Sequence, residues 1–433
     1  MADLTVNMAG IESPNPFWLA SAPPSNTGDQ IARAFDAGWG GAVWKTLGEP
    51  IENTWSRYSS VDLNGTRMMG LNNIELITDR ALDVNLKEIT AVKKRYPKNA
   101  VVVSLMVESK REAWHEIVKQ VEDAGADGVE LNFGCPHGMS ERGMGSSIGQ
   151  VPEYCAQITE WVKEVANTPV LVKLTPNITD IRTAARAAKQ GGADGVSLIN
   201  TISSVTSVDL DTLTPRPSVG NMSSHGGYCG PAVKPIALNM VSSIAADPET
   251  LDFPISGIGG IETWSDVAEF ILLGSTTIQV ATGVMHYGFR IVEGMIDGLG
   301  NYLDQKGMAS VDELRGLSVD RLTDWQHLNL NYVIKASVDQ SVCIGCGLCH
   351  VACEDGAHQA IGAERSEDGR TRVWIKEDAC VGCNLCSLIC PVPGCITMVE
   401  QDTGHDPLTW AEYEAGDDPD ALAPRPKHGL TIG

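Results

Sequence analysis

Short apolar runs alternate with segments of helical spacing along most of the chain. Each run has the length and composition of a buried strand. Eight can be distinguished: Phe17–Pro23, Gly41–Thr46, Ala100–Leu105, Gly128–Phe133, Val170–Thr175, Gly195–Asn200, Pro254–Gly259 and Thr277–Thr282. Strand and helix alternating in this way predict a (β/α)8 barrel, with a doubly wound sheet as the alternative. Residues 1–16, before the first strand, are expected to form a plug or a hairpin.

Helical spacing fills the segments between the runs. The expected helices are Ile31–Ala37, Asn85–Arg95, Arg111–Ala124, Pro152–Val165, Ile181–Gln190, Val233–Ala245 and Thr263–Leu273. Glycine follows several of them, and a glycine at this position often caps a helix in the left-handed conformation. Left-handed caps are therefore expected at Gly38, Gly125, Gly191 and Gly274.

Size and charge narrow the class of protein. The chain has 433 residues, enough for one large domain and a smaller one. Its net charge of −23 argues against nucleic acid or an anionic membrane surface as a partner. No apolar run reaches the ~18 residues of a membrane helix, and Met1–Gly10 lacks the pattern of a secretory signal. A cytoplasmic protein is therefore expected.

Polar or small residues recur where the apolar runs stop. In a (β/α)8 barrel, the C-terminal ends of the strands carry the functional side chains. The residues at these ends are Ser21, Ala22, Lys45, Thr46, Asn132, Cys135, Lys173, Asn200, Thr201, Gly259, Gly260, Thr282 and Gly283. Their recurrence at seven strand ends predicts one shared site at this end of the barrel.

Two of the strand ends have the composition of a phosphate cradle. Gly257–Gly260 follows the seventh run and leads into a helix, and Ala281-Thr282-Gly283 follows the eighth. Glycines let backbone N–H groups approach an anion, and these two loops form the usual phosphate site of such barrels. Each loop taken alone could equally be a tight turn.

Lys45 and Lys173 lie in otherwise apolar strands. A lysine there must either reach water at the strand end or meet an anionic partner, because an unpaired buried charge is unfavourable. The functional interpretation places one or both against an electron-rich ring. A positive charge near N1 of a flavin would stabilise its reduced form.

Amide side chains form a further candidate group. Asn73, Asn132, Asn200 and the neighbouring Thr201 offer donors and acceptors that suit a planar ligand with alternating N–H and C=O groups. Asparagines in loops are often turn formers instead. That alternative is less natural for Asn132 and Asn200, which end apolar strands.

Cys135 lies in a glycine-rich loop just after the fourth run. A thiol with an ordinary pKa of about 8.5 is mostly protonated at neutral pH, so it can act as a general acid. The alternatives are an inert buried thiol or a surface cysteine, and these are the expected classes of Cys155 and Cys229. His137 could orient Cys135 or have a structural role.

Eight of the twelve cysteines fall in two arrays, Cys343-x2-Cys346-x2-Cys349-x3-Cys353 and Cys380-x2-Cys383-x2-Cys386-x3-Cys390-Pro391. This is the bacterial ferredoxin pattern for two [4Fe–4S] clusters, in which the fourth cysteine of each run binds the other cluster. One cluster would take Cys343, Cys346, Cys349 and Cys390. The other would take Cys380, Cys383, Cys386 and Cys353. Zinc is the competing interpretation, and Cys395 is expected to be structural.

These patterns divide the chain into four parts. Residues 1–306 are expected to form the barrel, 307–336 a linker, 337–400 a ferredoxin-like domain and 401–433 an acidic, turn-rich tail.

The barrel resembles the dihydroorotate and dihydropyrimidine dehydrogenase family of FMN enzymes. The resemblance is carried by Lys45-Thr46, Asn72–Glu75, Asn132–Gly138, Val172–Asn177, Asn200-Thr201, Gly257–Gly260 and Ala281–Gly283. Fusion to a two-cluster domain, with Cys135-Pro136-His137-Gly138 in the loop, resembles the dihydropyrimidine dehydrogenases within that family.

The resemblance implies FMN in the barrel, with Lys45 and Lys173 beside its ring and the two glycine loops on its phosphate. It implies that Asn73, Glu75, Asn132, Asn200 and Thr201 hold uracil or thymine. Cys135 would protonate C5 after hydride transfer to C6, giving the 5,6-dihydropyrimidine.

No Gly-x-Gly-x-x-Gly follows a strand with an acidic residue ~20 positions on, so the sequence predicts no NAD site in this chain. The resemblance then implies a partner subunit that binds FAD and NAD, within a hetero-oligomer, and passes electrons from NADH through the clusters. Two alternatives stay open. One is a dihydroorotate dehydrogenase, and the other is a ferredoxin-type electron carrier whose barrel is a docking scaffold.

Overall fold

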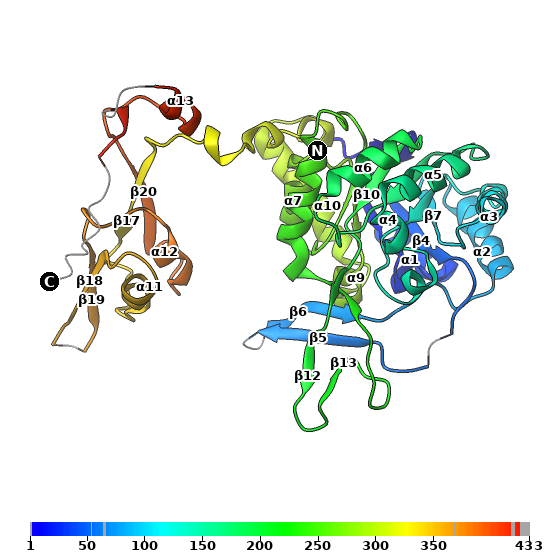
Figure 1. The fold of residues 1–433 in the computed structure, drawn as a ribbon, viewed down its shortest axis with the longest axis horizontal. Coiled ribbons are helices and arrows are strands. Elements are labelled where there is room, and N and C mark those ends of the chain that lie inside the picture. Colours follow the sequence, from blue (N-terminus) through cyan, green and yellow to red (C-terminus); the bar gives the residue numbers. More distant parts are fainter. Residues whose placement is uncertain (1, 53, 64–65, 368, 417–420, 425–433) are drawn as a thin grey trace. The chain divides into compact units, whose positions relative to one another are not determined.

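The computed structural model describes residues 2–52, 54–63, 66–367, 369–416 and 421–424. The chain divides into two compact units, Met1–Arg321 and Leu322–Gly433 (Figure 1). The first unit contains the barrel, and the second contains both cysteine arrays.

Eight parallel strands close into a barrel, in the order β10-β15-β16-β3-β4-β7-β8-β9. Their bounds are β3 Phe17–Leu19, β4 Gly41–Leu47, β7 Ala100–Leu105, β8 Gly128–Asn132, β9 Val170–Lys173, β10 Gly195–Leu198, β15 Ile255–Ile258 and β16 Thr277–Val280. All eight expected strands are present, so the predicted (β/α)8 barrel is confirmed. The first and last strands meet, with Phe17 paired to Ile278.

The helices surround the barrel strands (Figure 1). The longer ones are α1 Gly28–Ala37, α2 Leu82–Arg95, α3 Arg111–Asp123, α5 Pro152–Lys163, α6 Ile181–Gln190, α7 Lys234–Ala245, α8 Trp264–Leu272 and α10 Ile291–Lys306. Seven correspond to predicted helices, and α10 was not predicted. Its Val292, Met295 and Leu299 pack into the main core, which explains its stability.

Three of the four predicted glycine caps are confirmed. Gly38, Gly125 and Gly274 have φ values of 115°, 92° and 108°. The expectation for Gly191 is wrong, because its φ of −70° continues the right-handed conformation of α6. The chain reverses one residue later, where Gly192 has a φ of 88°.

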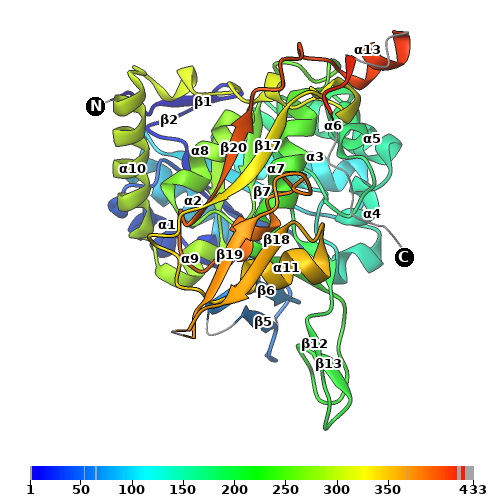
Figure 2. The ribbon, with the colours of Figure 1, turned by 90° about the vertical axis from the view of Figure 1, so that its left-hand side faces the viewer.

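A hairpin closes the N-terminal end of the barrel, as predicted for residues 1–16. It consists of β1 Val6–Met8 and β2 Ile11–Ser13. Met8 and Ile11 are buried in a cluster with Trp18, Val43 and other residues from the start of the barrel strands. Figure 2 shows β1 and β2 at the end of the barrel opposite β5 and β6.

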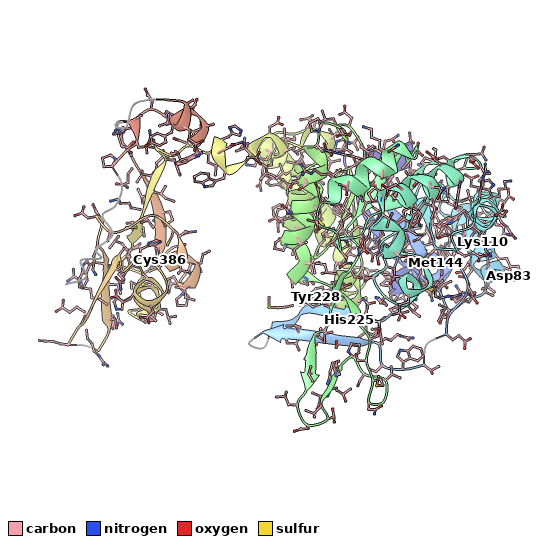
Figure 3. All side chains as sticks on the ribbon, viewed as in Figure 1. Asp83, Lys110, Met144, His225, Tyr228 and Cys386 are labelled. Carbon is pink, nitrogen blue, oxygen red and sulfur yellow. The ribbon has the colours of Figure 1, made fainter. Side chains whose placement is uncertain are left out.

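An antiparallel sheet at the other end was not predicted. Two long connections, after β4 and after β10, supply its strands. They are β5 Tyr58–Leu63, β6 Thr66–Asn73, β11 Ile202–Ser204 and β14 Gly226–Cys229, in the order β11-β14-β6-β5. A separate hairpin of β12 Ser207–Asp209 and β13 Thr214–Arg216 extends from the connection after β10, between β11 and β14 (Figure 1). The sheet places Tyr228 beside the barrel mouth (Figure 3).

Around the cysteine arrays, the described part of the second unit contains two short sheets and two short helices. β17 Val333–Val338 pairs with β20 Ile396–Gln401, and β18 Ile361–Arg365 pairs with β19 Thr371–Ile375. The helices α11 Leu348–Gly356 and α12 Leu385–Ile389 each contain cysteines of one array. Cys386, in α12, is labelled in Figure 3.

The expected domain boundaries at 306, 336 and 400 stay predictions. α10 ends at Lys306, while Val311 and Leu314 still pack into the barrel core. In the tail, α13 Trp410–Ala415 is capped by Thr409. Asn331 donates hydrogen bonds to the carbonyls of Asp406 and Ala421, at 2.8 and 2.9 Å. Residues 417–420 and 425–433 of the predicted tail lie outside the described residues.

Two further findings concern the whole described chain. None of its helices combines the length and the apolar character needed to cross a bilayer. All twelve cysteines are free.

Candidate active site and cysteine cavities

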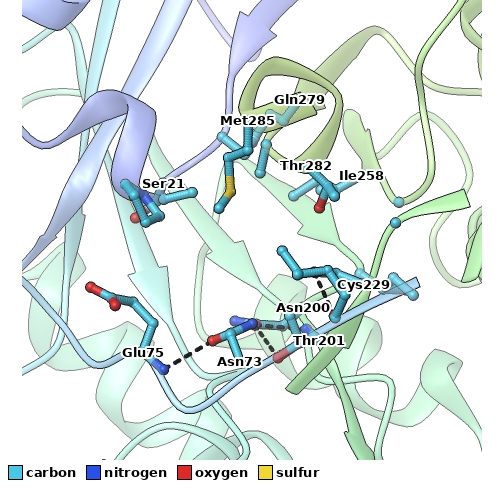
Figure 4. A pocket seen from close by; sticks show the side chains of 18 of the residues that line it. Ser21, Asn73, Glu75, Asn200, Thr201, Cys229, Ile258, Gln279, Thr282 and Met285 are labelled. Carbon is cyan, nitrogen blue, oxygen red and sulfur yellow. Dashed lines mark hydrogen bonds between the residues drawn. The ribbon is translucent and has the colours of Figure 1, made fainter. Parts of the chain in front are cut away.

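A pocket opens at the C-terminal mouth of the barrel, beside the antiparallel sheet (Figure 4). Every barrel residue that the sequence assigned to a site lines it: Ser21, Ala22, Lys45, Thr46, Asn73, Glu75, Asn132, Cys135, Lys173, Asn200, Thr201, Gly259, Gly260, Ala281, Thr282 and Gly283. The structure therefore brings the whole candidate set together. The individual roles of these residues stay predictions.

Hydrogen bonds between strand ends fix the polar side chains of the mouth. The Thr46 hydroxyl is 3.1 Å from the Ser21 hydroxyl and accepts a hydrogen bond from Asn132 Nδ2 at 3.0 Å. Asn132 Oδ1 in turn accepts from Asn200 Nδ2 at 3.0 Å. These contacts orient both amides before any ligand binds, which favours recognition of a rigid planar ligand.

Asn73 is held by the antiparallel sheet rather than by the barrel. Its Nδ2 donates to the Gly227 carbonyl at 3.0 Å, and its Oδ1 accepts from the Glu75 amide at 3.2 Å (Figure 4). The side-chain Nδ2 has a second N–H to donate, and Oδ1 can accept a second hydrogen bond. Asn73 thus remains able to donate to a ligand and to accept from one.

Lys45 is 5% exposed and forms an ion pair with Glu75, with 2.6 Å between Nζ and Oε1. The other oxygen of Glu75, Oε2, lies 2.8 Å from Arg57 Nε and accepts a hydrogen bond from the Tyr58 hydroxyl at 3.2 Å. Burial, followed by the charge of Glu75, raises the pKa of Tyr58, so this hydroxyl stays a donor. Lys45 is therefore buried rather than directed to water, and its charge is compensated by the Glu75 carboxylate on the pocket wall.

Lys173 is likewise 5% exposed, and its partner lies inside the barrel. Its Nζ is 3.7 Å from Oε1 of Glu130, a side chain with no exposed surface. Two uncharged donors, Ser197 Oγ at 2.7 Å and Gln279 Nε2 at 3.0 Å, reach the other oxygen of Glu130. The pocket thus contains two lysines with two different carboxylate partners.

Cys135 is positioned as a protonated thiol. Its Sγ donates to the His137 carbonyl at 3.5 Å. Burial raises the pKa of Cys135, and this effect outweighs the lowering effects of the His137 backbone and of the charge of Lys173. A thiol with a raised pKa keeps its proton at neutral pH, which a general acid requires.

His137 is neutral in this environment, because burial lowers its pKa. Its Nε2 lies 2.8 Å from the Glu75 carbonyl. A carbonyl only accepts, so Nε2 carries the proton. The buried Nδ1 has no hydrogen-bond partner among the described residues. His137 therefore ties the Cys135 loop to the segment that carries Glu75.

The two glycine loops form a narrow cradle. Gly259 and Gly260 have φ values of 136° and 71°, which favour glycine. A Cβ at Gly260 would lie 2.8 Å from Lys234 Cβ and 2.9 Å from the Gly230 carbonyl oxygen. The amides of these two glycines donate to no acceptor in the described part of the chain. Free N–H groups beside a side-chain-free backbone fit a phosphate group.

Several lining residues were not identified from the sequence: Tyr58, Tyr228, Gln279 and Glu262. Cys229 was expected to be inert or at the surface, but it lines the pocket, and its Sγ donates to the Leu71 carbonyl at 3.2 Å. Cys155 is fully buried, as expected. Glu130 was also missed, although a single acid within the apolar run Gly128–Phe133 is a signal of the same kind as Lys173.

The second unit contains two cavities walled by cysteines. One is lined by Cys343, Cys346, Cys349 and Cys390, and the other by Cys353, Cys380, Cys383 and Cys386. Each cavity thus combines three cysteines of one array with the fourth cysteine of the other, which is the arrangement expected from the spacing. Cys395 also lines the first cavity. No three His, Cys, Asp or Glu side chains of the described chain are spaced to hold a single metal ion.

A barrel with its pocket at the mouth, joined to a unit with two cysteine cavities, defines the class of protein. The chain belongs to the dihydroorotate dehydrogenase family, whose model matches residues 3–303. Residues 336–398 match the 4Fe-4S dicluster domain. The protein is therefore an oxidoreductase with an iron–sulfur domain.

Individual relatives narrow this class. The chain is 44% identical to the NAD-dependent dihydropyrimidine dehydrogenase subunit PreA of Escherichia coli (strain K12), over 92% of this chain and 96% of the relative. It is 42% identical to the chloroplastic dihydropyrimidine dehydrogenase (NADP(+)) of Arabidopsis thaliana, over 78% and 82%. It is 38% identical to the catalytic subunit of dihydroorotate dehydrogenase B (NAD(+)) of Pyrococcus abyssi, over 73% and 99%.

Proposed function

We propose that this chain is the pyrimidine-reducing subunit of an NAD-dependent dihydropyrimidine dehydrogenase. It would reduce uracil or thymine to the 5,6-dihydropyrimidine. The observation that carries the proposal is the pocket itself, in which a protonated thiol, Cys135, shares one wall with the oriented amides of Asn132 and Asn200. The names of the two relatives with 44% and 42% identity support the same reaction.

The residues of the pocket fit FMN. The unpartnered amides of Gly259 and Gly260, together with Ala281, Thr282 and Gly283, would hold the phosphate. Ser21, Ala22 and Thr46 would line the ring system, with Lys45 and Lys173 supplying positive charge beside it. FMN bound in this way would supply the hydride for C6 of the pyrimidine.

The chain's own side chains would position the substrate and supply the proton. Asn73, Asn132, Asn200 and Thr201 would bind the alternating N–H and C=O groups of the pyrimidine, with Glu75 at the edge of the same pocket. Cys135 Sγ would hold a proton for C5. Its raised pKa keeps the thiol protonated. Proton transfer leaves a thiolate, which the nearby positive charge of Lys173 would stabilise.

Electrons would reach the barrel through two [4Fe–4S] clusters in the cysteine cavities. Cys343, Cys346, Cys349 and Cys390 would hold one, and Cys353, Cys380, Cys383 and Cys386 the other. A partner subunit with FAD and NAD sites would take electrons from NADH, within a hetero-oligomer. The word "subunit" in the name of the Escherichia coli relative supports such a partner.

Anaerobic reoxidation tests this function. The full chain, reconstituted with iron, sulfide and FMN, is reduced chemically and mixed with uracil, thymine or orotate. The expected result is reoxidation of the flavin by uracil and thymine but not by orotate, because the ammonium of Lys45 and the guanidinium of Arg57 are already paired with Glu75. Reoxidation by orotate alone would favour dihydroorotate dehydrogenation. A chain that takes up clusters but no flavin would favour the electron-carrier alternative.

A further inference from the structure

The pocket rests on a buried polar layer in the barrel interior. Along β8, Val129 and Leu131 pack in the main core. Glu130, between them, points the other way, as alternation along a strand requires. It meets Lys173 from β9, Ser197 from β10 and Gln279 from β16.

Glu130 is the charged centre of this layer. Its side chain has no exposed surface, and its contacts come from three other strands. Gln279 Nε2 also reaches Ser256 Oγ at 3.2 Å, and Ser256 accepts from Thr277 Oγ1 at 2.8 Å. Towards the N-terminal ends of the strands lies the apolar cluster of Met8, Ile11, Trp18 and their neighbours, in which the indole N–H of Trp18 already donates to Ser13 Oγ at 3.0 Å.

A fully buried carboxylate is strongly unfavourable unless a positive charge and hydrogen bonds compensate it. Within the described residues, Lys173 is the cation that forms an ion pair with Glu130, since Lys45 pairs with Glu75. Lys173 and Gln279 also line the pocket, whereas Glu130 does not. Glu130 therefore acts on any pocket ligand through Lys173 and Gln279 and does not touch it.

We propose that Glu130 is a positioning residue that holds the Lys173 ammonium against the pocket floor, and that this ion pair sets the reduction potential of the bound flavin. The inference rests on the proposed function, because it takes FMN as the ligand. Reduction of FMN by two electrons with uptake of one proton leaves the ring system with one additional negative charge. Lys173 stabilises that charge and Glu130 opposes it, so the balance between them fixes how easily the flavin is reduced.

The two lysines of the pocket differ in this respect. Glu75, the partner of Lys45, is itself on the pocket wall and also contacts Arg57 and Tyr58. Glu130 has one cationic partner and lies beneath the pocket floor, shielded from water. A charge change at Glu130 is therefore less screened and acts on the ligand without removing a contact to it.

The test is a spectroelectrochemical titration of the flavin in the full, reconstituted chain. E130Q removes one negative charge while keeping the shape of the side chain, so the midpoint potential is expected to become more positive. K173M is expected to make it more negative, and the E130Q/K173M double variant should return towards the native value. S256A is the matched control, because it alters a fully buried member of the same layer without changing charge, and it should leave the potential unchanged.

A flavin-bound E130Q protein with an unshifted potential would overturn the proposal. If E130Q does not fold, the comparison of K173M with the double variant decides the matter, since the double variant contains no unpaired charge. The double variant should then have the more positive potential and the higher melting temperature.

Thermal unfolding of the flavin-free chain tests the Glu130–Lys173 ion pair without depending on the proposed function. A chain that binds no flavin contradicts the proposed function, while K173M melting well below the double variant still supports the ion pair. Equal melting temperatures would mean that Glu130 and Lys173 are not coupled, which also overturns the proposal.

Discussion

The barrel pocket and the cysteine cavities are built in opposite ways. The pocket takes its lining from segments that range from Ala20 to Met285, with contributions from the C-terminal end of every barrel strand except β7 and from the inserted sheet. Each cysteine cavity takes its sulfur atoms from two short runs. The pocket therefore exists only when the whole barrel is folded, whereas the cavities depend on local turns around the cysteines.

The two regions also differ in what stabilises them. The barrel core is a large apolar cluster to which all the surrounding helices contribute, and it contains one buried cysteine, Cys155. In the core of the second unit, five of the ten buried residues are cysteines: Cys349, Cys353, Cys380, Cys386 and Cys395. We therefore expect ligand binding to be coupled to folding in the second unit but not in the barrel.

The largest expected effect follows from this coupling. Cys386→Ser should abolish one cluster, lower the bound iron by about half and lower the melting temperature of the second unit, while the barrel keeps its own thermal transition. Iron analysis and calorimetry measure the two outcomes. Cys395→Ser is the matched control, because Cys395 lines a cavity but lies outside both sets of four, and it should retain its iron. Loss of the barrel transition in Cys386→Ser would break the comparison.

In the barrel, a single change should remove chemistry and leave the fold intact. Cys135→Ala is expected to lower the rate of uracil reduction roughly 10²–10⁴-fold, the usual contribution of a general acid. Stopped-flow reoxidation of the reduced flavin measures this rate. The flavin content and the melting temperature should stay close to native values. Cys135→Ser retains a weakly acidic proton, so its rate of uracil reduction should lie between those of the native protein and Cys135→Ala.

The pH dependence of the same step identifies the donor. Burial raises the pKa of Cys135 above its ordinary value of about 8.5, and the protonated thiol is the active form. The rate should therefore stay constant through neutral pH and fall only in the alkaline range, above the raised pKa. Burial lowers the pKa of His137. A rate that falls as the pH rises through slightly acidic values would thus assign the proton to His137 instead.

The smallest effect concerns the cradle. Gly260→Ala introduces a Cβ 2.8 Å from Lys234 Cβ at a φ of 71°, which should weaken FMN binding about tenfold. Equilibrium dialysis of FMN measures the affinity. Gly288→Ala is the control, because Gly288 has a φ of 81° but no neighbour within 4 Å of the added Cβ. Equal losses of affinity in both variants would show that backbone strain alone is responsible.

The two regions explain why the sequence predicted some features and missed others. Cysteine spacing lies within a few residues, so the composition of each cavity could be predicted directly. The barrel strands could also be predicted, because they are buried on both sides and therefore read as continuous apolar runs. Once the barrel was predicted, residues at the strand ends, such as Lys173 and Asn200, could be assigned to one shared site.

The antiparallel sheet could not be predicted in the same way. Its strands pair across the chain, with Asn73 opposite Gly227, and several of their residues are half-exposed. No periodicity in either segment reveals this pairing. Tyr58 and Cys229, which depend on it, were therefore missed. Glu130 was missed for another reason, since its polar partners come from three other strands and are not adjacent in sequence.

The pairing of Phe17 with Ile278 has a consequence for the order of events during synthesis. β3 emerges early from the ribosome, but its neighbour β16 follows only after nearly all of the barrel has been translated. Until then, one edge of β3 has no partner, and an unpaired strand edge favours association with other chains. The cysteine arrays are made later still. Cluster insertion thus takes place on a chain whose barrel can already have closed.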